Sequence, residues 1–148
     1  MTRPNFLVRL RDDTSGTAIL EFGLLGPAFI AMLLGVLQVG IGLQNYNAMR
    51  NLSADVARYA MIQYSTGNRL NNEQLRSYAV AHGQGAPYLL NGDRITAAVT
   101  TAGTQRVSGA VELNLRINYV IPTLFDSMGM RGPSLSYTRP IFLTEADE

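Results

Sequence analysis

The sequence of 148 residues contains no cysteine and only one histidine. The lack of cysteine excludes disulfides, thiolate zinc sites, iron–sulfur clusters and cysteine nucleophiles. A single histidine excludes a histidine-rich metal site and argues against most histidine-based catalysis. The formal net charge is +1, which argues against a nucleic-acid binder, because such proteins usually carry a basic excess. The length excludes two large domains with a cleft between them.

Motifs of the common enzyme classes are also missing. There is no nucleophile elbow, phosphate loop, zinc-protease helix motif or calcium loop. Gly83-Gln84-Gly85 begins like a dinucleotide fingerprint, but it lacks the third glycine and precedes no βαβ unit. His82 is expected to be a packed or surface side chain, and Glu112 is expected to point outward from a strand without a partner carboxylate. The sequence therefore predicts no enzyme, no catalytic residue, no cofactor and no metal ligand.

Charge is absent from one long segment of the chain. Between Glu21 and Arg50, 28 consecutive residues carry no charge, and within residues 22–43 the only strongly polar side chain is Gln38. A helix of that length spans about 33 Å, which is enough to cross the hydrocarbon core of a membrane. A buried core helix is the soluble alternative, but so small a domain leaves too little structure to cover it. We therefore predict a membrane span at about residues 22–43.

A cleaved secretory signal is a second alternative for this segment. Its apolar region should run about 7–15 residues and end at a small-residue cleavage site, whereas this run is longer and continues into a polar helical pattern. The positive-inside bias is slight, because Arg3, Arg9 and Arg11 precede the span while Arg50 and Arg58 follow it closely. The short N-terminal segment favours a cytoplasmic N-terminus and therefore an extracytoplasmic head.

Helical spacing of hydrophobic residues continues beyond the span. The stripe expected to face a core consists of Tyr46, Met49, Leu52, Val56, Tyr59 and Ile62. We therefore predict one helix over residues 17–65, about 70 Å long, with a stop at residues 65–68. A second, shorter helix should begin at a capping box formed by Asn71 and Gln74. The glycines Gly83 and Gly85, with Pro87, are expected to end it.

The hydrophobic period then changes to two residues, which is typical of strands. Residues 95–100 give a weak strand, residues 111–119 a clear one, and a last strand runs from Leu135 to about Arg139, before Pro140. In the clear strand, the face expected to be buried carries Val111, Leu113, Leu115, Ile117 and Tyr119. No long crossover helix separates the strands, so an antiparallel meander is favoured over a parallel sheet. The predicted fold class is α+β: a long N-terminal helix followed by a small head of residues 66–148.

Glu21 is the one polar residue at the edge of the apolar run that a purely structural role does not easily explain. An ionised carboxylate at a membrane boundary is costly, and such residues are functional candidates. The alternative is an interfacial glutamate near a helix N-terminus, where negative charge is favourable by about 0.3–1 kcal/mol. Glu21 follows Thr17 by four residues and Gly16 by five.

This region resembles the processing site of a type IV prepilin: a short charged leader, a glycine, four residues, a glutamate and then an apolar helix. More narrowly, residues 16–61 resemble the TadE-like family, minor pseudopilins of bacterial tight-adherence pili. The matching pieces are Glu21-Phe22, Pro27 and Asp55-Val56-Ala57-Arg58-Tyr59-Ala60. The chain departs from the family pattern at Gln38, where glutamate is frequent, and at Gly23, where alanine is usual.

The resemblance implies that a prepilin peptidase of the inner membrane cuts between Gly16 and Thr17, so that residues 1–16 are a cytoplasmic leader. It also implies that Glu21 docks against the new N-terminal amine of a neighbouring subunit. Ala31 and Gly35 are suitably spaced for helix packing through small residues. The implied partners are the inner membrane, the peptidase, other pilin or pseudopilin subunits and the pilus assembly platform, without nucleic acid. The expected location is the bacterial inner membrane, or the pilus at the cell surface.

The function implied is that of a minor pseudopilin-like structural or assembly protein of a tight-adherence pilus. An uncleaved single-pass membrane protein with an extracytoplasmic binding module is the main alternative, and removal of the leader distinguishes the two. An anchored enzyme would need a convergent polar pocket in the head, which the sequence does not show. A major filament subunit is a third alternative, although such subunits are usually much shorter than this chain.

Overall fold

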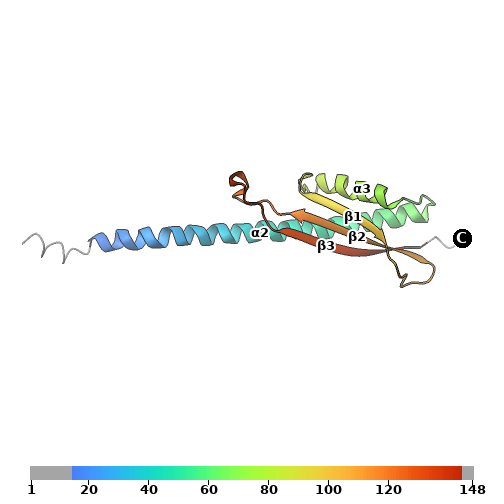
Figure 1. Ribbon diagram of the computed structural model, residues 1–148, viewed down its shortest axis with the longest axis horizontal. Helices are drawn as coiled ribbons and strands as arrows, with labels where there is room; N and C mark the ends of the chain where they lie inside the picture. Colours follow the sequence, from blue (N-terminus) through green and yellow to red (C-terminus); the bar gives the residue numbers. More distant parts are fainter. Residues whose placement is uncertain (1–14, 145–148) are drawn as a thin grey trace, which may run out of the picture. The chain divides into compact units, whose positions relative to one another are not determined.

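The computed structural model describes residues 15–144 and has an α+β fold, as predicted. Figure 1 shows its elements in chain order. They are α2 (Ser15–Ser65), α3 (Asn72–Gln84), β1 (Ile95–Thr101), β2 (Ala110–Val120), the short 3-10 helix η1 (Asp126–Met128) and β3 (Ser134–Thr144). The chain divides into two compact units, and the boundary falls inside α2, between Val39 and Gly40. Each unit is therefore described separately.

The first unit consists, in its described part, of the N-terminal portion of α2. Most of its large apolar side chains are exposed, and the exposed fraction reaches 78% at Phe22 and 77% at Leu24. Apolar surface on this scale is unfavourable in water and favourable in lipid. By length and composition, α2 is the one helix among the described residues that is able to cross a membrane. Its N-terminal portion is thus suited to anchor the chain.

The C-terminal end of α2 lies where the sequence predicted it. The Gly67 amide donates to the Tyr64 carbonyl (3.1 Å), and the Asn68 amide donates to the Gln63 carbonyl (2.9 Å). This pair of bonds is the Schellman arrangement, which satisfies the last carbonyls of a helix. It needs a residue in the left-handed conformation, and Gly67 supplies it with φ of 82°. Helix α3 likewise begins at the predicted capping box, since Asn71 and Gln74 exchange both side-chain-to-backbone hydrogen bonds.

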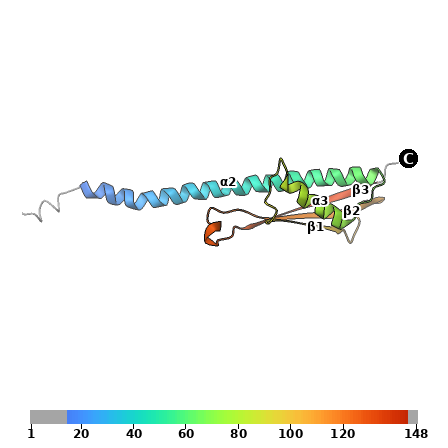
Figure 2. The ribbon, with the colours of Figure 1, turned by 90° about the horizontal axis from the view of Figure 1, so that it is seen from above.

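The second unit has two layers, with the C-terminal part of α2 and helix α3 packed against one face of the sheet (Figure 2). Met49, Leu52 and Val56 of α2 are fully buried there. The other members of this core come from α3 and from alternate residues of the strands. They include Leu75, Ala79, Ile95, Leu115, Ile117 and Ile141. One hydrophobic core therefore joins the helices to the sheet within residues 40–144.

The sheet is the predicted antiparallel meander, with strand order β1-β2-β3. Ile95 pairs with Tyr119, and Leu113 pairs with Ile141. Strand β3 is longer than expected, because it continues through Pro140 to Thr144. The expectation that Pro140 follows the strand was wrong. Proline is tolerated in an edge strand, and β3 has a single neighbour in this sheet.

The helix packing differs from prediction where backbones approach closely. Ile62 is 53% exposed rather than buried, whereas the small residues Ser53, Ala57 and Ala60 of α2 are buried. Helix α3 ends at Gln84 with Gly85 as its C-cap, as predicted, and Gly83 in its last turn is buried. A Cβ on Gly83 would lie 2.8 Å from Leu52 Cδ2 and 2.9 Å from Ile95 Cδ1. Small residues therefore mark the closest contacts, which a search for large apolar residues overlooks.

Candidate processing and assembly site

Gly16 and Thr17 both lie in the first turn of α2 and are exposed. Amides in the first turn of a helix have no intrahelical acceptor, and glycine in a helix costs about 1 kcal/mol relative to alanine. This turn therefore opens at low cost into the extended form that a protease site usually requires. Of the predicted leader, residues 1–14 lie outside the described residues.

Glu21 lies one helical turn beyond Thr17 and is also exposed. Residues four apart on a helix are neighbours on one face, with a rise of about 6 Å between them. The side chains of Glu21 and Thr17 are thus on the same side of α2. The arrangement leaves Glu21 accessible to a group from another chain.

Ala31 and Gly35 are exposed and lie one turn apart on α2. A Cβ on Gly35 would meet nothing within 4 Å. The same part of α2 has a shallow apolar hollow at Gly26, which the sequence analysis did not predict. Phe22, Leu25, Phe29 and Ile30 line this hollow. The sequence does contain a signal for this hollow, because Gly26 lies four residues after Phe22 and three before Phe29, which puts all three on one helix face. A hollow of this kind can receive a side chain from a packed helix.

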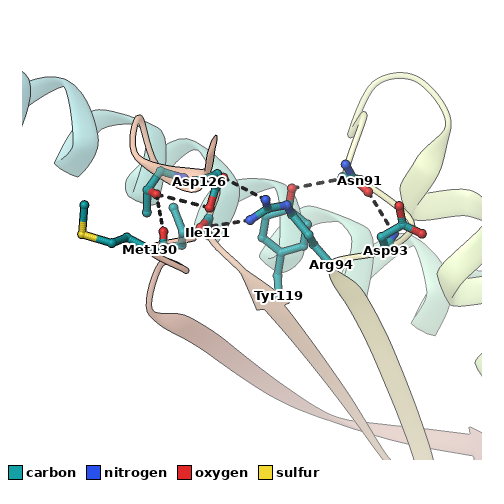
Figure 3. A network of polar contacts seen from close by, with 8 residues as sticks. Asn91, Asp93, Arg94, Tyr119, Ile121, Asp126 and Met130 are labelled. Atoms are coloured by element: carbon teal, nitrogen blue, oxygen red, sulfur yellow. Dashed lines mark hydrogen bonds and ion pairs between the residues drawn. The ribbon is translucent and has the colours of Figure 1, made fainter. Parts of the chain in front are cut away.

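In the head, a network of polar contacts ties the β2–β3 connection to the start of β1 (Figure 3). The Asp126 carboxylate accepts hydrogen bonds from Arg94 Nη2 (2.8 Å) and from the Thr123 amide (2.9 Å). The Thr123 hydroxyl also donates to the Met130 carbonyl (2.8 Å). The Thr123 amide, together with Arg94, holds the pKa of Asp126 below its ordinary value. These polar groups are directed at one another and at the backbone, so they fix the shape of the connection.

The environment of Glu112 also differs from the prediction. It was expected to be exposed and without a partner carboxylate, but only 3% of its surface is accessible. Its carboxylate accepts hydrogen bonds from the Arg106 guanidinium and from the Arg106 amide (3.2 Å). The reason is that the connection between β1 and β2 folds over the outer face of the sheet and covers Glu112. Val111, which was expected to be buried, is instead 37% exposed.

The Glu112–Arg106 pair predicts a pH dependence of head stability. The hydrogen bond from Arg106 lowers the pKa of Glu112 in the folded state. A lowered pKa means that stability is fully present above the unfolded pKa, about 4.3, and is lost as pH falls through the folded value. We expect Glu112→Gln to reduce the melting temperature of the head at pH 7 and to flatten its dependence on acid. Thermal unfolding of both chains at neutral and acidic pH measures this. If the variant loses stability in acid as the unmodified chain does, the loss is caused by other carboxylates and not by Glu112.

His82 is half-buried in a row of aromatic side chains between α2 and the segment that follows α3. Its ring lies 5.3 Å from the ring of Tyr78, which in turn stacks on Tyr59 at 3.8 Å. Tyr88 donates a hydrogen bond to Asp55, and burial, followed by this bond, raises the pKa of Tyr88 to about 12. The histidine is therefore packed. Across residues 15–144, no group of three histidine or acidic side chains is placed to hold a metal ion.

Together, these features define a class of protein: a chain with an N-terminal apolar helix suited to a membrane and a small α+β head built on the same helix. Residues 16–58 match the family model described as TadE-like protein. The match covers the first part of helix α2, where the chain is similar to the TadE-like family, and this similarity suggests a protein associated with the Tad pilus and the membrane. No curated protein and no solved structure matches the chain.

Proposed function

We propose that the protein is a minor pseudopilin-like structural or assembly protein of a tight-adherence pilus, processed by a prepilin peptidase after Gly16. One observation carries the proposal. A glycine in an exposed first helical turn precedes Glu21 by five residues, at the head of an exposed apolar helix. The family match begins at this same glycine.

Processing and assembly use neighbouring groups in this proposal. Cleavage after Gly16 creates a positively charged amine at Thr17. In a poorly hydrated site, that amine and a carboxylate each carry a desolvation penalty. Pairing the two charges offsets much of this penalty, whereas an unpaired charge bears it in full. Glu21 of one subunit would supply the partner for the amine of its neighbour. The hollow at Gly26 and the small residues Ala31 and Gly35 would allow the apolar helices to approach closely.

The proposed orientation places the N-terminus in the cytoplasm, where the peptidase acts, and the head in the periplasm. The partners are the peptidase, other pilin or pseudopilin subunits and the assembly platform. The role is structural rather than catalytic. In support of this, the Arg94–Asp126 and Arg106–Glu112 pairs are engaged within the head itself.

The intact mass of the membrane-extracted chain tests this function. In cells with the peptidase, the chain should begin at Thr17 and lack sixteen residues, because the bond after Gly16 lies in a turn that opens easily. In cells without the peptidase, the mass should be that of the precursor. A chain that keeps its leader in peptidase-positive cells would contradict the proposal and would favour the uncleaved membrane-anchored binding module.

A further inference from the structure

The connection between β2 and β3 carries an unusual concentration of exposed apolar side chains. The exposed fractions are 47% for Leu124, 42% for Phe125, 74% for Met128 and 54% for Met130. In the rest of the described head, the large exposed apolar side chains are spread over other segments, at Leu89, Val107 and Val111. We call residues 122–133 the apolar loop. Such a cluster marks a contact surface rather than a solvated turn.

The position of the apolar loop along α2 indicates what it contacts. Ile121, immediately before the loop, brings its Cδ1 atom within 3.4 Å of the place of a Cβ on Gly42. Gly42 lies at the C-terminal end of the apolar run, and the next charged residue is Arg50. Both sides of this contact belong to the same compact unit. The loop therefore lies beside the C-terminal end of the predicted membrane span, near Gly42, where the boundary between hydrocarbon and water is expected.

The internal bonding of the loop keeps its apolar side chains outward. The Ile121 amide donates to the Pro133 carbonyl (3.0 Å), which closes the loop at its base. Asp126 accepts hydrogen bonds from Arg94 and Thr123, so this carboxylate is paired within the head (Figure 3). A paired carboxylate beside exposed apolar side chains suits an interface with lipid.

We propose that the apolar loop is a second membrane contact, which rests in the interfacial region of the bilayer surface from which α2 emerges. Phe125 and Met128 insert among the upper acyl carbons, and Arg131, an exposed residue of the same loop, meets the phosphate groups of lipids. The head is thereby held at a fixed height and orientation over the membrane. This inference rests on the membrane span of the proposed function, but not on cleavage or on pilus assembly.

Fluorescence tests the inference directly, because the chain contains no tryptophan. Phe125→Trp in the full chain, reconstituted in phosphatidylcholine vesicles, provides a single fluorophore in the loop. Interfacial apolar groups sit about 5–10 Å into the headgroup and acyl boundary. Lipids brominated at upper acyl carbons should therefore quench this tryptophan. The matched control is Val107→Trp, because Val107 is also exposed (47%) but lies in the β1–β2 connection at the opposite end of the sheet.

We expect Phe125→Trp to be quenched at least about twofold more than Val107→Trp, as its interfacial depth requires. Met128→Trp is a second reporter at a more exposed position, and it should behave in the same way. Equal quenching of the loop reporters and the control would overturn the proposal. A blue-shifted loop tryptophan that brominated lipid does not quench, and whose emission changes with protein density, would assign the surface to a second copy of the chain instead. The mass of each sample reports leader cleavage separately, so failure of the two proposals is distinguishable.

Discussion

Replacing Gly16 with phenylalanine is expected to leave the precursor uncut in cells that contain the peptidase. A glycine without a side chain enters a narrow protease site, and a bulky ring does not. The helix itself offers no obstacle to the change, because a Cβ on Gly16 would meet nothing within 4 Å. A loss of cleavage would therefore report on recognition by the peptidase rather than on misfolding. Intact mass of the membrane fraction measures the ratio of precursor to mature chain.

The matched control for this variant is Gly23→Phe. It makes the same chemical change in α2, and a Cβ there also meets nothing within 4 Å, but the residue lies beyond the proposed scissile bond. We expect this control to be cut like the unmodified chain. Finding Thr17 as the N-terminal residue of Gly16→Phe would rule out Gly16 as the recognition residue.

Glu21→Ala is expected to separate processing from assembly. The carboxylate lies beyond the scissile bond, so the chain should still be cut. The new amine of the docked neighbour would then lack its partner, and an unpaired buried charge costs about 3–5 kcal/mol. A cost of this size corresponds to a loss of about a hundredfold or more in docking, since 1.4 kcal/mol is a factor of about ten. Surface pili should therefore be lost in a complemented deletion strain, while mature size and protease resistance of the head stay normal.

Two further variants test whether the effect comes from the charge of Glu21 and whether it is specific to that position. Glu21→Gln keeps the shape and hydrogen bonding but removes the charge, so it should impair assembly less than alanine only if hydrogen bonding contributes to docking. Glu73→Ala removes a glutamate on α3 whose ion pair with Arg76 is exposed, and it should leave piliation unchanged. Normal piliation with Glu21→Ala would contradict the docking role and leave Glu21 as an interfacial residue near the helix N-terminus.

Local signals explain what the sequence could predict. The end of α2 depends on Gly67 and its neighbours, and the start of α3 depends on Asn71 and Gln74, so both follow from short stretches of sequence. The alternation in β2 follows from burial of one face. The same holds for the prepilin-like motif, in which Gly16, Glu21 and the apolar run are contiguous.

Contacts between distant segments explain what the sequence could not predict. The burial of Glu112 depends on the connection that folds over it, and the fixed shape of the apolar loop depends on Arg94, which lies 32 residues before Asp126. The length of β3 depends on its place in the sheet, which determines whether Pro140 is tolerated. At the N-terminal site, the structure adds to the sequence motif that Gly16, Thr17 and Glu21 are exposed, and that Thr17 and Glu21 lie one turn apart on α2. The docking partner belongs to another chain, so no pattern within this sequence specifies it.

Pro140 also has a consequence for a chain that is confined to a membrane. Such confinement keeps copies in two dimensions and at high local concentration, with their heads side by side. An edge strand with an unbroken row of backbone donors is a template for pairing with other chains, and proline is one of the devices that prevents this. Pro140 stands within β3, on the open side of a three-stranded sheet. Pro140 thus removes one backbone donor from this edge of the sheet, which makes pairing between heads through β3 less favourable.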